Sequence, residues 1–183
     1  MFYANGLAEA WQHFGRFLVD GGATADGESA WEKSIALRKS IGSDPDTHGA
    51  DYVHRFARSL ISSPFEAQRD AALAAQVAAA IRDGHEEHAE YWSTLGAALL
   101  SQMKFEESIE TLRQAKLRRI EPHARDSFLL ALAYQNRGKD GDDSKAADEF
   151  QNAAKLMSEL APANVELNQL LAEAGNALGI QFE

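Results

Sequence analysis

The 183-residue sequence predicts an all-α protein, an array of antiparallel helix hairpins that ends in a single capping helix. Apolar residues recur three and four positions apart in successive segments, as one face of a helix requires. Short stretches rich in Gly, Pro, Asp and Ser separate these segments, and such residues favour turns and helix ends. No stretch alternates apolar and polar residues for the length of a strand. We therefore expect nine helices, which form four hairpins and a cap.

Residues 89–117, AEYWSTLGAALLSQMKFEESIETLRQAKL, contain the clearest hairpin. Small residues at Gly96 on the first helix and Ser108 on the second remove side-chain bulk where two helix backbones approach each other. Larger side chains fill the space alongside them. The positions that define the pattern are Trp92, Leu95, Gly96, Leu99, Ser108, Leu112 and Ala115.

This pattern resembles the tetratricopeptide repeat, a helix-turn-helix unit with the signature W-x2-L-G-x2-Y followed by A-x3-F. The sequence departs from the signature at Leu99, Ser108 and Leu112 by mild changes in size. The resemblance implies a right-handed superhelix in which the first helix of each hairpin lines the concave side. Segment 64–156, with EYWSTLGAALL and SFLLALAYQNRG, is most similar to repeat arrays C-terminal to planctomycete serine/threonine kinases. The sequence has no kinase motif, so kinase activity is not implied.

One repeat cannot bury its own apolar face, so at least about three should stack. An upstream copy has the same spacing without a gap: Trp11, Phe14, Gly15, Leu18, Gly27, Trp31 and Ser34. A downstream copy has three extra residues in its turn: Ser127, Leu130, Ala131, Tyr134, Ala146, Phe150 and Ala153. The weakest copy has a longer turn, SSPFEAQRD: Val53, Phe56, Ala57, Leu60, Ala74, Ala78 and Ile81.

We expect one domain over residues 1–183, with repeats at about 4–41, 50–83, 87–118 and 122–160 and a cap helix at about 163–178. The first repeat should consist of helices at about 4–19 and 27–41, and residues 43–49 should form a loop. Pro122 suits the first turn of the helix that ends near Arg137. The basic residues Lys116, Arg118 and Arg119 should interact with the negative end of their helix dipole.

Composition narrows the functional classes. The formal net charge of −10 disfavours long-range attraction to nucleic acid and anionic lipid. The chain contains no cysteine, which excludes disulfides and thiol chemistry. Its N-terminal residues lack the pattern of a signal peptide, and no stretch is long and apolar enough for a membrane span. We expect a cytoplasmic protein.

Candidate chemical sites have simpler explanations. The histidines of HEEH at 85–88 are three positions apart rather than four, with no evident third ligand, so we expect no metal site. The DGDD stretch at 140–143 has Lys145 where a calcium loop needs glycine, and we interpret it as a polar turn. We expect Trp11, Trp31 and Trp92 to pack in the core rather than to form a ligand cage. No catalytic or cofactor motif occurs, so we predict neither enzyme activity nor a cofactor.

First-helix residues that point away from the packing stripe are the candidates for a peptide-binding groove. In the first two repeats they are Gln12, His13, Arg16, His54, Arg55 and Arg58, which make a cationic half. In the last two they are Thr94, Ala97, Leu100, Phe128, Leu129, Leu132 and Gln135, which make an apolar half. Such a groove suits a peptide with carboxylates and an apolar anchor, with Arg55 and Arg58 binding the carboxylates. Alternatively, the arginines pair with acidic residues on neighbouring turns and the cap helix covers Leu129 and Leu132. The arginines in question are Arg16, Arg55 and Arg58, and the acidic residues are Glu9, Asp20 and Asp51.

The function predicted from these observations is a non-catalytic protein-interaction scaffold. The lysine and asparagine pair with which some tetratricopeptide proteins bind chaperone C-termini is replaced here by Gln12 and Arg16, then His54 and Arg58, so chaperone binding is not implied. One alternative is an RNA-binding helical repeat, which the acidic charge disfavours. Another is a structural module that self-associates or supports a partner enzyme.

Overall fold

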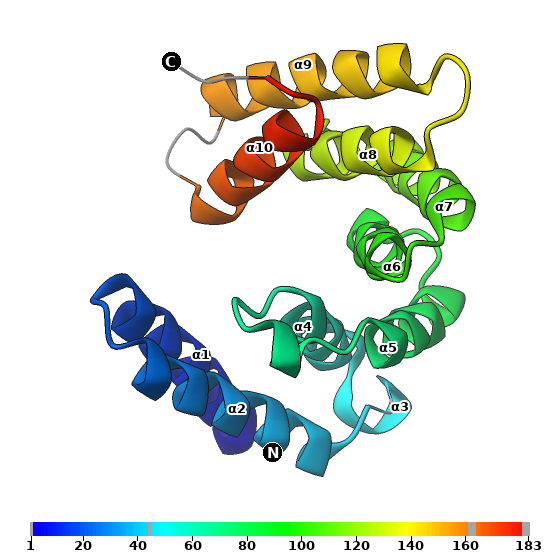
Figure 1. Ribbon diagram of the computed structural model, residues 1–183. Helices are drawn as coiled ribbons and strands as arrows, with labels where there is room; N and C mark the ends of the chain where they lie inside the picture. The colour runs from blue at the N-terminus through cyan, green and yellow to red at the C-terminus, as the bar shows by residue number, and fades with distance from the viewer. Residues whose placement is uncertain (1, 44, 161–163, 181–183) are drawn as a thin grey trace. The chain divides into compact units, whose positions relative to one another are not determined.

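The computed structural model describes residues 2–43, 45–160 and 164–180, and every regular element in these ranges is helical (Figure 1). This confirms the predicted all-α class. The α-helices are α1 (Phe2–Asp20), α2 (Thr24–Ile41), α3 (Pro45–His48), α4 (Ala50–Ile61), α5 (Ala71–Gly84), α6 (Ala89–Ser101), α7 (Phe105–Arg118), α8 (Ala124–Arg137), α9 (Asp142–Leu160) and α10 (Val165–Ala177). A 3-10 helix, Glu66–Gln68, interrupts the connection between α4 and α5. No helix within these ranges has the length and apolar character needed to cross a bilayer.

The structure has ten α-helices in the described residues rather than the nine predicted, because the loop at 43–49 contains the short helix α3. Its first residue is Pro45, whose fixed φ suits the first helical position. The helix expected from Pro122 begins instead at Ala124, since His123 is its N-cap and accepts a hydrogen bond from the Arg125 N–H at 3.2 Å. The predicted loop position Asp44 and the predicted helix stop at Ala161 and Pro162 lie outside the described residues.

Three of the four predicted hairpins are closely packed helix pairs: α1 with α2, α6 with α7, and α8 with α9. Small residues allow the close approach. A Cβ at Gly96 would lie 2.6 Å from Leu112 Cγ, and the buried Ser108 hydroxyl donates to the Gly96 carbonyl at 2.8 Å. In the first hairpin a Cβ at Gly15 would lie 2.9 Å from the Gly27 carbonyl oxygen. The remaining predicted hairpin, α4 with α5, is not a closely packed pair in the described residues; α4 packs instead against α2 and α3, and a longer connection separates it from α5.

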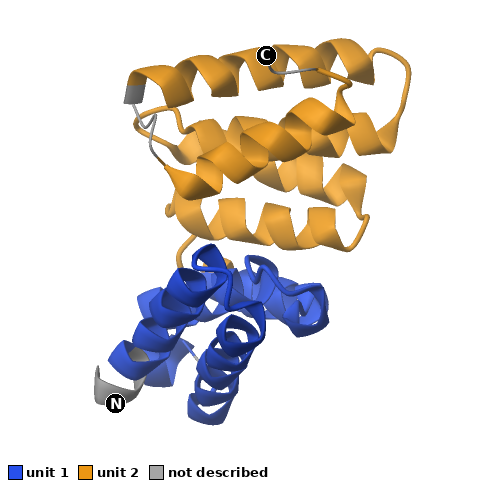
Figure 2. Cartoon of the chain, turned by 60° about the vertical axis from the view of Figure 1, so that its left-hand side comes forward, with its two compact units in different colours: residues 1–81 blue, residues 82–183 orange. Residues whose placement is uncertain are grey.

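The chain divides into two compact units, residues 1–81 and residues 82–183 (Figure 2). Unit 1 contains α1 to α4 and most of α5, and unit 2 contains α6 to α10. The core of unit 2 includes side chains from α8, α9 and α10, among them Phe128, Phe150 and Leu167. The rings of Phe128 and Phe150 meet edge to face with centroids 5.8 Å apart. The sequence expectation of a single domain is not tested by this division.

Candidate functional site

The predicted cationic half of the groove lies on α1 and α4 of unit 1. Arg55 pairs with Glu9 of α1 at 3.0 Å, and its Nε donates to the Asp51 carbonyl at 3.4 Å. The ion pair therefore brings α1 and α4 together and occupies the guanidinium that we expected to bind a ligand. Of the predicted residues in this half, His13 and Arg55 are exposed, and Gln12, Arg16, His54 and Arg58 are half-buried.

Arg38 of α2 lies buried beside this surface, which the sequence did not indicate. Its Nη2 donates to Gln12 Oε1 at 3.2 Å, so Gln12 holds an internal partner. Burial lowers the pKa of Arg38, while the charge of Glu9 acts in the opposite direction. Tyr52 donates its hydroxyl to the Arg38 carbonyl at 3.2 Å, and burial raises the pKa of that phenol. The polar residues of this region thus stabilise unit 1 internally.

The predicted apolar half is part of the core of unit 2. Thr94, Ala97, Phe128 and Leu132 are all buried, as is Leu129. Leu100 and Gln135 are half-buried. We had expected these side chains to line an open groove, and the burial of the first four corrects that expectation.

Helix α10 covers the α8 part of this surface, which is the physical reason why Phe128 and Leu132 are buried. It packs mainly against α8 and less against α9 (Figure 1). Its buried residues Leu167 and Ala174 join Phe128 and Leu132 in one cluster. The partly buried side chains that pack against the cluster include Leu100, Leu156, Leu170, Leu171 and Leu178. The expected capping helix therefore occupies the place that a peptide anchor would need.

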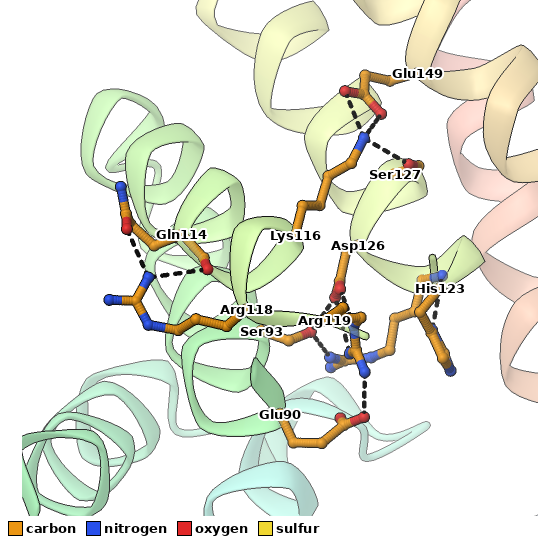
Figure 3. Close-up of polar contacts among 11 residues, drawn as sticks. Glu90, Ser93, Gln114, Lys116, Arg118, Arg119, His123, Asp126, Ser127 and Glu149 are labelled. Atoms are coloured by element: carbon orange, nitrogen blue, oxygen red, sulfur yellow. Dashed lines mark hydrogen bonds and ion pairs between the residues drawn. The ribbon is translucent and has the colours of Figure 1, made fainter. Parts of the chain in front are cut away.

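A polar network joins α6, the C-cap residue Arg119 of α7 and the first turn of α8 (Figure 3). The Ser93 hydroxyl donates to Asp126 Oδ1 at 2.5 Å and accepts from Arg125 Nη1 at 2.5 Å. Arg119 pairs with the same carboxylate and donates to Glu90 Oε1 at 2.6 Å. Asp126 is completely buried, so its charge depends on Arg119 and the Ser93 hydroxyl.

Further ionic contacts connect this network to neighbouring helices. Arg125 donates to Glu166 of α10 at 2.9 Å, which fixes the start of α10 against α8. Lys116 pairs with Glu149 of α9 at 2.6 Å and also donates to the Ser127 hydroxyl at 3.1 Å (Figure 3). Of the three basic residues expected at the helix dipole, Lys116 and Arg119 form ion pairs with other helices, and Arg118 donates to the Glu86 carbonyl and to Gln114.

Electrostatics in this network favour a charged Glu90 carboxylate and a neutral His123 imidazole. Burial by itself would raise the pKa of Glu90, but its hydrogen bond to Arg119 and the positive charge there hold the pKa below its ordinary value. The pKa of Arg119 is raised because the two carboxylates outweigh the opposing effect of burial. The pKa of His123 is lowered by burial and by the Arg119 charge. The Ser93 hydroxyl, held between a carboxylate and a guanidinium, acts as a structural link.

The DGDD stretch forms a second ionic cluster, at the start of α9. Arg137 donates to Asp142 Oδ2 at 2.8 Å and Oδ1 at 2.6 Å, and the Lys139 N–H donates to the same carboxylate at 3.0 Å. The Arg137 hydrogen bonds lower the pKa of Asp142 despite its burial. The Asp142 carboxylate therefore stabilises the turn between α8 and α9.

The three tryptophans have different environments. Trp31 is buried, as predicted. Trp11 is half-buried with the Lys33 ammonium 4.7 Å from its ring centroid. Trp92 is also half-buried, between the guanidinium groups of Arg118 at 4.2 Å and Arg82 at 5.0 Å. The prediction of core packing is therefore confirmed for Trp31. Trp11 and Trp92 instead contact cationic side chains at the surface of the protein.

One face of α1 remains open to solvent. Leu7, Phe14 and Phe17 are 51%, 48% and 71% exposed. The repeat pattern predicts that Phe14 packs against a neighbouring helix. Its counterparts Phe56 and Leu130 are buried, but Phe14 is exposed. Phe17 likewise corresponds to the buried residues Ser59, Ala98 and Ala133. The sequence offered one signal for this face, a phenylalanine at a position that holds small residues in the other copies.

Comparison with protein-family models and with curated proteins finds no match for this chain.

Proposed function

We propose that this protein is a non-catalytic interaction module of the tetratricopeptide type, with its hairpins in a right-handed superhelical arrangement. The repeated pattern of small and large residues and the close pairing of α1 with α2, α6 with α7 and α8 with α9 support the repeat architecture. The partner in this proposal is a protein that contributes an amphipathic helix, and the surface that receives it is the exposed face of α1.

The observation that carries the proposal is the exposure of Phe14 and Phe17. Large aromatic side chains open to water on one helix face are typical of surfaces that bind another protein. In α8 the counterparts of these residues, Leu130 and Ala133, are buried in a helix that packs against the preceding helix α7. In α4 the counterparts Phe56 and Ser59 are buried, and α4 packs against α2. A helix is therefore the element that fits the same face of α1.

This surface replaces the apolar half of the predicted groove, because α10 already covers Phe128 and Leu132 and the α6 residues Thr94 and Ala97 are buried as well. The nearby ion pair between Arg55 and Glu9 is solvent-accessible and contributes little binding energy by itself. Affinity should therefore come mainly from burying apolar area on α1.

The test uses two double variants of the protein as baits and compares the partner proteins that each captures from extracts of the native organism. Phe14→Ser with Phe17→Ser removes the α1 face. Leu117→Ser with Ile120→Ser is the matched control, because these side chains are 76% and 101% exposed in unit 2. We expect a partner that the control retains and the α1 variant loses, followed by one-to-one binding of the purified pair. Circular dichroism checks that both variants remain folded.

Other outcomes would overturn this proposal. Equal capture by both variants would place the binding surface elsewhere. A doubled solution mass that the α1 substitutions abolish would assign the face to a second copy of the chain. Salt-sensitive RNA binding by the purified chain, abolished by the same substitutions, would favour the RNA-binding alternative.

A further inference from the structure

We infer that the turn between α5 and α6 forms a binding site for a divalent transition metal ion of the Zn²⁺ class, with His85, Glu87 and His88 as ligands. The ligand atoms of these three side chains lie within 4.8 Å of one another. The sequence showed two histidines and lacked a third ligand for a metal. The fold supplies that ligand, because the turn brings the Glu87 carboxylate to the two imidazoles.

The ligand types and distances suit such an ion. Two imidazoles and one carboxylate are a donor set that Zn²⁺ accepts, with an open position for water. Bonds of about 2.0–2.2 Å place neighbouring ligands of a tetrahedral zinc site about 3.3 Å apart. His88 Nε2 already lies 3.2 Å from Glu87 Oε1. The His85 and His88 rings are 5.8 Å apart between centroids, and His85 is half-buried, so an ion would require rotation of the exposed His88 and Glu87 side chains.

The backbone of this turn is fixed by contacts outside the ligand set. The Glu86 carbonyl accepts the Trp92 indole N–H at 2.8 Å and Arg118 Nε at 2.6 Å. The His88 N–H donates to the His85 carbonyl at 3.1 Å, which holds the two histidines in one turn. Because the turn is already formed, an ion would have to order only side chains.

The nearby guanidinium groups of Arg82 and Arg118 oppose metal binding by charge repulsion, and the ion pair with Asp83 partly offsets the charge of Arg82. Arg82 donates through Nε to Asp83 Oδ1 at 2.8 Å, and both Arg82 and Arg118 lie over the Trp92 ring. Tyr91 packs its ring against both imidazoles, with centroids 6.0 Å from His85 and 5.2 Å from His88. These contacts leave the ligand edges of His88 and Glu87 at the exposed surface.

Titration calorimetry of the metal-free full chain, prepared without a histidine tag, tests the site with ZnCl₂. We expect one equivalent of Zn²⁺ to bind, and His85→Ala or His88→Ala to weaken binding by at least about tenfold. Glu86→Gln and His13→Ala are matched controls that should leave binding unchanged, since neither side chain belongs to the cluster. Binding should weaken from pH 7.5 to pH 5.5, because protons compete for imidazole nitrogens.

A second readout locates the ion directly. Imidazole nitrogen resonances of His85 and His88 should shift on addition of Zn²⁺, while those of His13 should not. Circular dichroism of each variant verifies that the helices persist. Three results would overturn the inference: no stoichiometric binding, equal binding by the His85→Ala and His88→Ala variants, or binding of Mg²⁺ as strong as that of Zn²⁺.

Discussion

Helices α1 and α8 carry the same repeat positions, yet one is open where the other is buried. On α8 the counterparts of Phe14 and Phe17 are Leu130 and Ala133, which are completely buried, and α8 packs against α7, α9 and α10. The large residues Phe14 and Phe17 on α1 stay exposed. The comparison shows that position within a repeat does not decide exposure. Exposure depends on whether another element of the chain packs against that face.

Removal of α10 should produce the largest effect on unit 2. Ending the chain after residue 163 would expose Phe128 and Leu132, which α10 now helps to cover. Each large apolar side chain contributes about 1.5–3 kcal/mol when buried. The loss of several such contacts is comparable with the whole stability of a domain, about 5–15 kcal/mol. A thermal melt followed by circular dichroism should show a non-cooperative or much lower transition, and an unchanged melt would refute the covering role of α10.

Replacing a phenylalanine should lower the free energy of unfolding much more on α8 than on α1. Phe128→Ala should lower the free energy of unfolding by about 3–5 kcal/mol, because it leaves a cavity beside Phe150. Phe17→Ala should change it by no more than about 0.5 kcal/mol, since that side chain is exposed. Urea denaturation measures both values. Similar losses at the two positions would mean that an unrecognised contact covers Phe17.

Ion pairs provide the next contrast between the units. Arg119→Ala should destabilise unit 2 by about 3 kcal/mol, because it leaves the buried Asp126 carboxylate without its cation. Arg55→Ala should cost less than about 1 kcal/mol, since its pair with Glu9 is solvent-accessible. Chemical denaturation at low and high salt should show salt dependence mainly for the Arg55 pair. Equal losses would contradict this assignment.

The glycines of the hairpins offer a smaller contrast. Gly96→Leu should cost about 2–3 kcal/mol, because its side chain would collide with Leu112. Gly138→Ala should cost about 1 kcal/mol, since this residue caps α8 at a φ of 64° with open space around it. Urea unfolding midpoints would rank the two variants. A fully stable Gly96→Leu variant would contradict the close approach of α6 and α7.

His123 should give the smallest effect, visible as a pH dependence. Its pKa is lowered in the folded protein, so the unfolded chain binds the proton more readily. The contribution of neutral His123 is complete above the unfolded pKa of about 6.5 and is lost as pH falls from there through the lower folded pKa. His123→Gln should flatten the fall in unfolding free energy over this window, which urea denaturation at a series of pH values measures. If the free energy of unfolding of His123→Gln depends on pH as in the unmodified protein, His123 does not have this role.

The sequence by itself determined the helical class and the sites of close helix approach. Gly96 and Ser108 identified the contact of α6 with α7, and Gly15 with Gly27 identified that of α1 with α2. These predictions succeeded because the spacing of small and apolar residues along a helix directly controls how closely a neighbouring backbone can approach. Periodicity is a local property, and it can be seen in one segment at a time.

Only the tertiary structure decided which faces remain open and which side chains meet. Nothing in the segment around Phe128 shows that α10 lies over it, and nothing near Arg119 identifies Asp126 and Glu90 as its partners. The approach of Glu87 to His85 and His88 likewise depends on how the turn folds. Burial and ion pairing are set by residues distant in the chain or by backbone geometry that periodicity leaves undefined. The positions of these side chains therefore follow from packing, while the helices that carry them follow from the sequence pattern.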